Sequence, residues 1–225
     1  MTEGEIFMAD NSLSVLDSIY VQALNGLPGS DSVEELAKHY LAESGRLEDK
    51  VDSLINWQVA KCSATGFLTG LGGIITLPVT IPADIGVTWY VQARMAAAVA
   101  YMGGYEIHND KVKTMVYISL AGNAANEVLK NVGVKIAMDF AEKKLSSGIL
   151  KQIQTAVATK ILSKGATQFT KIIPIIGGIV GAGFDGVTTK AIGTAAKKFF
   201  IANRPPVELT RVIDENEVPA WAKNI

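Results

Sequence analysis

The stretch GGIITLPVTIPAD, residues 72–84, decides how this chain is expected to fold. It closes a run without any charged residue that covers residues 62–83. Pro82 suits the first turn of a helix, because the amide hydrogen that proline lacks would find no acceptor there. The stretch therefore predicts a helix from Pro82 to about Met102, and Gly103-Gly104 is expected to end it.

Apolar residues recur at helical spacing on both sides of this stretch, and no run alternates as a half-buried strand would. Ser32 followed by Glu35 matches a capping box, in which each residue satisfies a free amide at the start of a helix. Residues 1–10 are expected to form a loose terminus, and Gly45 to cap the end of the second helix. The other predicted helices cover residues 12–27, 32–44, 47 onward into the uncharged run, 109–132, 134–145, 149–163 and 166–202.

The sequence thus predicts an all-α fold, a single compact helical domain around two apolar central helices that glycine and proline interrupt. The segments 62–78 and 166–187 are expected to be its most buried helices. Residues 1–45 are expected to form a helical segment that packs on the core, residues 46–203 the core itself, and residues 204–225 a tail.

Composition narrows the classes of function. Charged residues make up 19% of the 225 residues, below the roughly 25% of typical domains, and the net charge is -1. Low charge indicates a large core, a buried interface or contact with a bilayer, and the lack of basic excess argues against a nucleic-acid partner. No signal peptide is recognisable, so a cytoplasmic location is expected, with peripheral contact with the inner membrane as an extension of it.

The catalytic and ligand motifs that a sequence can reveal are incomplete here. Cys62 is the only cysteine, and neither histidine stands in a pattern typical of a metal or nucleophile site. Residues 181–186 match G-x-G-x-x-G, but dinucleotide binding needs a preceding strand within a βαβ unit, and no strand is predicted here. Glu208 stands near the position of the required acidic residue but follows Pro205-Pro206 and is not at a strand end. We therefore expect no metal and no cofactor, and whether the chain is an enzyme stays open, with a non-enzymatic role favoured.

A short polar face crosses the otherwise apolar helix that follows Pro82. Asp84, Thr88 and Gln92 are four residues apart and share one side of it. Arg94 is the only lysine or arginine between Lys61 and Lys111, and a lone charge in such a segment needs a partner or water.

Asp185 is a second isolated charge, in a glycine-rich apolar run. The structural interpretation is a buried network, Arg94 with Asp185 or one centred on Asp84, that fixes how the core helices pack. The functional interpretation is a site for a ligand or lipid headgroup lined by Asp84, Thr88, Gln92, Arg94 and Asp185.

Glycines four residues apart allow two helix backbones to approach closely, in a membrane or in a soluble core. The uncharged run is long enough to suggest a membrane span, but its glycines, prolines and threonines favour a buried helix, with shallow membrane contact as the alternative. The glycines expected at close helix crossings are Gly66, Gly70, Gly73, Gly177 and Gly181.

These features together resemble the EcsC family over roughly residues 55–200. The resemblance implies an α-helical bacterial protein, and the family is named for a gene neighbour of an ABC exporter; it implies no established reaction. The matching features are the glycine pair at 72–73, Pro78 and Pro82 with the Pro-Ala-Asp step, Gln92-x-Arg94-Met95, Gly103-Gly104-Tyr105, and the segment 173–178 followed by Gly181 and Asp185.

Three functions remain in view. The first is a non-enzymatic binding module at or near the cytoplasmic membrane surface, with a lipid or a membrane-associated protein as its partner. The second is a small-molecule site or enzyme lined by Asp84, Gln92, Arg94 and Asp185. The third is a toxin-like protein whose apolar helices insert into membranes. The sequence does not determine the oligomeric state.

Overall fold

The computed structural model describes residues 3–63, 83–121, 147, 150, 151, 153–155, 157, 158 and 182–202. Over these residues the chain forms helices and no strand, which confirms the all-α prediction. The principal helices are α1 (Glu3–Asn25), α2 (Val33–Leu41), α3 (Leu47–Ser63), α5 (Ala83–Met102), α6 (Asp110–Leu120) and α11 (Ala182–Phe200).

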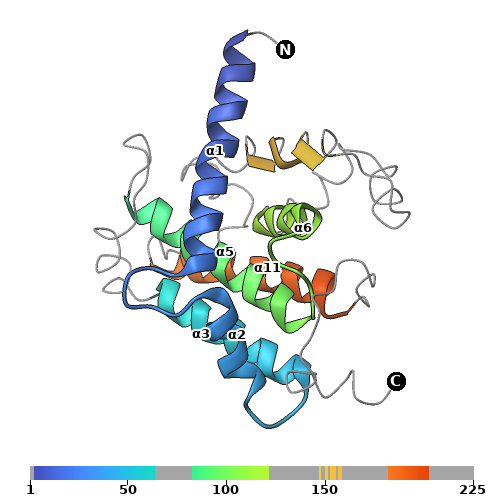
Figure 1. Ribbon diagram of the computed structural model, residues 1–225. Helices are drawn as coiled ribbons and strands as arrows, with labels where there is room; N and C mark the ends of the chain where they lie inside the picture. Colours follow the sequence, from blue (N-terminus) through green and yellow to red (C-terminus); the bar gives the residue numbers. More distant parts are fainter. Residues whose placement is uncertain are drawn as a thin grey trace.

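Helix α5 lies at the centre and packs against each of the other five helices (Figure 1). After Arg94 the helix is apolar all round, as expected of a helix buried on every side. Five alanines let the neighbouring helices approach closely, and all five are fully buried. They are Ala93, Ala96, Ala97, Ala98 and Ala100.

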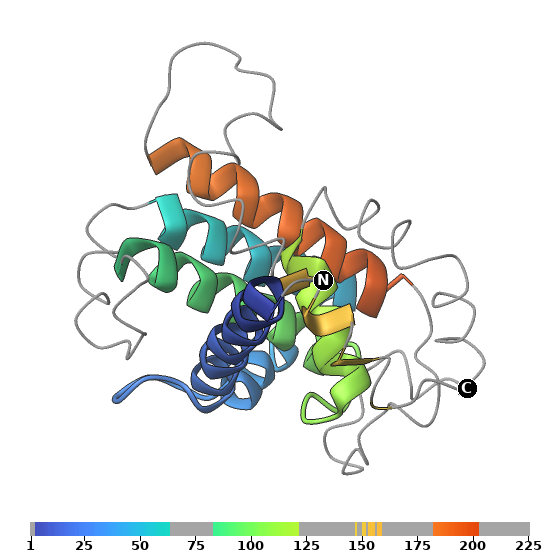
Figure 2. The ribbon, with the colours of Figure 1, turned by 90° about the horizontal axis from the view of Figure 1, so that it is seen from above.

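Helices α3, α5 and α11 lie side by side (Figure 2). Gly186 of α11 lies against Ser63 of α3, whereas Lys197 further along pairs with Asp52, so α3 and α11 are antiparallel. Gln92 of α5 contacts Thr189, and the residue after Met102, Gly103, touches the Phe200 carbonyl, so α5 and α11 are parallel.

The capping box at the start of α2 is confirmed. The Glu35 amide donates to Ser32 Oγ at 3.2 Å, and the Ser32 amide donates to Glu35 Oε2 at 2.7 Å. The helix ends at Leu41 with Ala42 as its C-cap, so the prediction that it reaches Ser44 with Gly45 as the cap was wrong. The buried residues of this helix end at Tyr40, and the residues that follow Ala42 are Glu43, Ser44 and Gly45, which have no apolar side chain to bury in another turn.

The end of α5 is also as predicted. The Gly104 amide donates to the Tyr101 carbonyl at 2.9 Å, and the Tyr105 amide to the Ala100 carbonyl at 3.1 Å, the two bonds of a Schellman motif. Gly104 has a φ of 87°, in the left-handed region that favours glycine. The glycine pair therefore stops the helix and turns the chain toward α6.

Two other helix boundaries differ from the predictions. Helix α1 begins at Glu3, so the loose terminus expected over residues 1–10 was wrong from residue 3 onward. Helix α6 follows the Asn109 cap as expected but ends at Leu120 rather than near residue 132. Within the described parts of 147–158 every residue is helical.

Several predictions fall outside the described residues. These are the helix over 134–145, most of the segments 62–78 and 166–187, the tail 204–225, and all five glycines expected at close crossings. The structure instead shows a close crossing at Gly193 of α11, where a Cβ would lie 2.6 Å from Ile55 Cγ2 of α3.

Candidate functional site

Three polar residues of α5 are buried in the middle of the helix layer. Thr88, Gln92 and Arg94 are 8%, 4% and 9% exposed. Gln92 points to α11, where its Nε2 donates to Thr189 Oγ1 at 3.1 Å and to Thr188 Oγ1 at 3.5 Å. Gln92 therefore joins α5 to α11 through polar contacts inside an apolar interface.

Arg94 points to a different neighbour. Its Nη2 donates to the Ser32 carbonyl at 3.5 Å, next to the start of α2. Two residues apart on a helix are about 200° apart around its axis, which is why Gln92 and Arg94 face opposite sides. The polar positions of α5 thus serve two separate interfaces.

The predicted contact of Arg94 with Asp84 or Asp185 stays a prediction, because the structure does not describe the side chain of either aspartate. The backbone does place Asp84 ten residues before Arg94 on α5, about 15 Å along the helix. Asp185 belongs to α11, the helix on the Gln92 side.

Charges of both signs surround Arg94. Burial lowers the pKa of Lys61, the positive charge of Arg94 lowers it further, and Asp31 acts in the opposite direction. Hydrogen bonds with Ser32 lower the pKa of Glu35, and the positive charges of Lys38 and Arg94 add to that effect. Arg94 therefore lies within electrostatic range of Lys61 on α3 and Glu35 on α2.

Two buried donors in this region have no acceptor. Arg94 Nη1 and Gln58 Nε2 are shielded from solvent and make no hydrogen bond, the two such side-chain atoms found among the described residues. Gln58 is 2% exposed and occupies the buried stripe of α3 with Leu54, Ile55 and Cys62. Gln58 was not predicted as a site residue, although its place on the apolar stripe of the helix is visible in the sequence.

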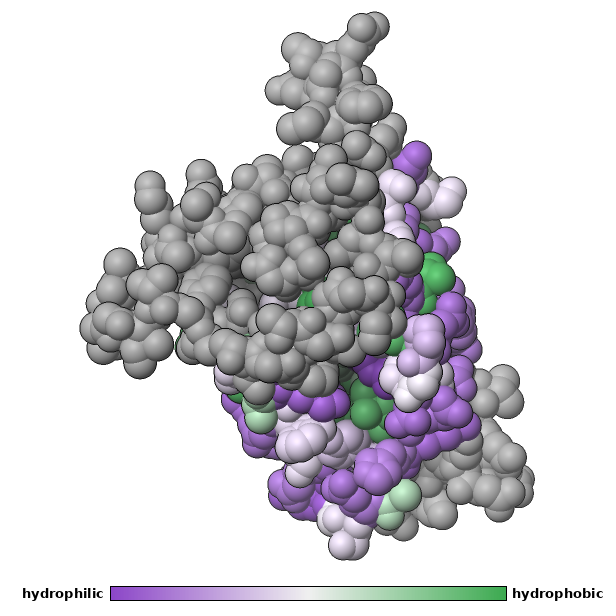
Figure 3. Space-filling model, turned by 90° about the vertical axis from the view of Figure 1, so that its left-hand side faces the viewer, coloured by the Kyte–Doolittle hydropathy of each residue, from purple (hydrophilic) through white to green (hydrophobic). Residues whose placement is uncertain are grey.

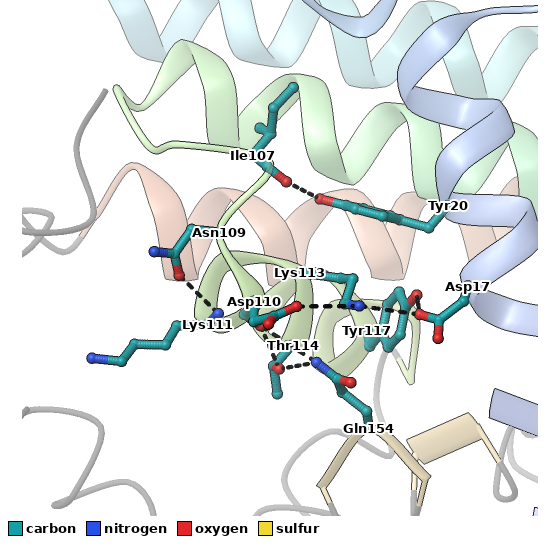
Figure 4. A network of polar contacts seen from close by, with 10 residues as sticks. All are labelled: Asp17, Tyr20, Ile107, Asn109, Asp110, Lys111, Lys113, Thr114, Tyr117 and Gln154. Atoms are coloured by element: carbon teal, nitrogen blue, oxygen red, sulfur yellow. Dashed lines mark hydrogen bonds and ion pairs between the residues drawn. The ribbon is translucent and has the colours of Figure 1, made fainter. Parts of the chain in front are cut away.

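A second polar cluster joins α1 to α6 (Figure 4). Tyr117 Oη donates to Asp17 Oδ1 at 2.6 Å, and Lys113 Nζ lies 3.3 Å from both Asp17 Oδ1 and Asp110 Oδ1. Burial raises the pKa of Tyr117 well above its ordinary value, and the hydrogen bond to Asp17 adds to the shift. The phenol is therefore protonated and acts as a hydrogen-bond donor that holds the two helices together.

The same cluster extends to the described part of 147–158. Gln154 Nε2 donates to Thr114 Oγ1 at 2.7 Å (Figure 4). Tyr20 Oη donates to the Ile107 carbonyl at 2.8 Å, and its ring meets that of Tyr117 edge to face with centroids 5.6 Å apart. Each of these polar groups has a partner in another part of the chain, so the cluster holds α1, α6 and the described part of 147–158 together.

Neither metal-binding nor membrane-spanning elements are found in the described ranges. No group of three or more His, Cys, Asp or Glu side chains within them could hold a metal ion. No described helix combines the length and the apolar character that crossing a membrane requires.

The family comparison agrees with the helical architecture. The model of the EcsC protein family matches residues 6–202, so the relationship extends over α1 and α2 as well as the 55–200 region where the motifs lie. No curated protein matches the chain, and neither does any solved structure. Because the match covers most of its length, the chain belongs to the EcsC protein family.

Proposed function

We propose that this EcsC-family protein is a non-enzymatic binding module that acts at the cytoplasmic surface of a membrane. Its partner would be lipid or a membrane-associated protein. The observation that carries the proposal is Trp57, a large hydrophobic side chain that is 55% exposed on the outer face of α3. Tryptophan has an apolar body and a polar N–H group, and it is enriched where membrane and water meet.

The surroundings of Trp57 support this interpretation. Lys61 lies one turn later with its Nζ 5.7 Å from the Trp57 ring centroid, and long lysine side chains suit the headgroup region. Helix α3 leads directly into the uncharged run of residues 62–83. Val187, 52% exposed, follows Gly186, which lies against Ser63 at the same end of α3.

Shallow contact is favoured over deep insertion. On the face in Figure 3 the described residues are mainly hydrophilic, with only scattered hydrophobic side chains. A few anchoring side chains would give weak, reversible binding that depends on the lipid composition.

The alternative function, a small-molecule site or enzyme lined by Asp84, Gln92, Arg94 and Asp185, has less support. Gln92 and Arg94 face different helices, so the two side chains do not line one common site. No contact of the described residues favours the toxin-like alternative.

Flotation of the full chain with vesicles tests the proposal. We expect the chain to float with vesicles and Trp57→Ala to reduce the floating fraction severalfold. Val21→Ala is the matched control, because Val21 is equally exposed, at 55%, but lies on α1. The proposal fails if the wild-type chain stays in the dense fraction with every lipid, or if both substitutions have the same effect.

A further inference from the structure

The two buried donors without acceptors, Arg94 Nη1 and Gln58 Nε2, lie on neighbouring helices. Helices α3 and α5 are side by side in Figure 2, and both pack against α11. Residues 188–193 of α11 meet both helices, through Gln92 of α5 and through Ile55 of α3. Arg94 is two residues after Gln92 on α5, and Gln58 is three residues after Ile55 on α3. Because a helical turn has 3.6 residues, each lies within one turn of the point where its helix contacts residues 188–193 of α11.

Lys61 connects the two donors on the α3 side. It is three residues after Gln58, a spacing that brings side chains to about 5–6 Å between Cβ atoms. It also lies within electrostatic range of Arg94. The region thus holds the positive charges of Lys61 and Arg94. It also holds two hydrogen-bond donors, Arg94 Nη1 and Gln58 Nε2, that have no acceptor among the described residues.

Carboxylates near these cations do not supply the missing acceptors. The Glu35 carboxylate accepts from the Ser32 amide in the capping box and makes no hydrogen bond with Arg94 Nη1, and Asp31 acts on Lys61. The Ser32 carbonyl contacts the other guanidinium nitrogen, Nη2, at 3.5 Å and already accepts from the Leu36 amide at 3.0 Å. Arg94 Nη1 therefore keeps a positive charge and a hydrogen with no acceptor.

We propose that Arg94 Nη1 and Gln58 Nε2 bind one oxyanion of phosphate type between α2, α3 and α5, with Lys61 as a second positive charge. Buried donors are nearly always satisfied in native proteins, and a bound ion is one way to satisfy them. Arginine suits this role because its guanidinium recognises phosphate oxygens with directed hydrogen bonds. The oxyanion could belong to a lipid headgroup or to a soluble phosphate compound, and both share this chemistry.

Thermal unfolding of the full chain with inorganic phosphate, against chloride at equal ionic strength, tests the soluble source. The site variants are Arg94→Met and Gln58→Leu, which keep side-chain bulk and remove the donors. Arg46→Met is the control, because it removes the same charge from an exposed arginine that pairs with Glu48. Far-UV circular dichroism establishes that each variant is folded.

We expect phosphate to raise the melting temperature of the wild type and of Arg46→Met. Each site variant should weaken phosphate binding about tenfold or more, because it loses a hydrogen bond to a charged group. Without phosphate, Arg94→Met should be close to the wild type in stability, because it loses one long hydrogen bond, 3.5 Å to the Ser32 carbonyl, and a charge interaction with exposed Glu35.

Flotation with phosphatidylcholine vesicles, with and without phosphatidylglycerol, tests the headgroup source. If the site binds headgroups, phosphatidylglycerol increases binding of the wild type and of Arg46→Met but not of the two site variants. The inference is overturned if neither phosphate nor phosphatidylglycerol distinguishes the site variants from the control. It does not depend on the membrane proposal, because phosphate stabilisation without flotation would support the site and refute membrane binding.

Discussion

Tyr117 of α6 donates a 2.6 Å hydrogen bond to the Asp17 carboxylate of α1, across one hundred residues of sequence. The phenol is fully buried, whereas the Asp17 side chain is 39% exposed and also pairs with Lys113. One hydrogen bond thus fixes the long N-terminal helix to the helix that follows α5.

Replacing Tyr117 with Phe should destabilise the fold by about 1–2 kcal/mol, because the bond to a charged acceptor is lost while Asp17 keeps Lys113. Urea unfolding measures the change. A double-mutant cycle with Asp17→Asn should give a coupling energy of about 1 kcal/mol. Additive effects would show that the two residues stabilise the protein independently.

Alkaline pH should weaken the fold through its buried tyrosines. Burial raises the pKa of Tyr105 to about 12, from an ordinary value of 10.0. The folded state therefore binds the Tyr105 proton more tightly than the unfolded state does. The resulting stabilisation of the fold is complete below pH 10 and is lost as the pH rises toward 12. Unfolding free energies measured between pH 9 and 11.5 should fall less steeply for Tyr105→Phe; equal slopes would contradict the shift.

Gly193→Ala should destabilise the crossing of α11 and α3. The added methyl would lie 2.6 Å from Ile55 Cγ2, and such overpacking costs about 1–3 kcal/mol. Chemical denaturation gives the value. In an Ile55→Ala background the same glycine change should cost much less, because the opposing side chain has gone; an unchanged cost would mean that the backbone, not Ile55, limits the space.

Ser32→Ala should destabilise α2 by about 1 kcal/mol, because the Glu35 amide loses its acceptor. The hydrogen bonds with Ser32 lower the pKa of Glu35 in the folded state. The stabilisation that these hydrogen bonds give the folded state is therefore complete above the ordinary pKa of the Glu35 carboxyl. It is lost as the pH falls through the lower pKa that Glu35 has in the folded state. Ser32→Ala keeps the backbone bond to Glu35, the larger cause of the lowered pKa, so the pH test uses Glu35→Gln, which removes the carboxylate. Thermal melts from pH 7 to pH 3 should show a weaker acid dependence for Glu35→Gln than for Glu34→Gln, a neighbouring change outside the box.

Local sequence determined where several helices begin and end. The Ser32–Glu35 box, the Asn109 cap and the Gly103-Gly104 stop were predictable because each depends on hydrogen bonds within a few residues. The helix predicted from Pro82 to about Met102 is α5, but its central position was not predicted, because the segments 62–78 and 166–187 were expected to be the most buried helices. Such features were sufficient for the all-α fold, and the linked motifs for the family.

The tertiary structure alone decided which polar groups meet. Gln92 and Arg94 are two residues apart in the motif, and helix rotation directs one to α11 and the other to α2. Gln58 stands in an ordinary amphipathic pattern, and only the packing of α3 buries it beside α5 without an acceptor. Hydrogen bonds such as Tyr117 to Asp17 depend on the relative placement of distant helices, which periodicity within one segment does not specify.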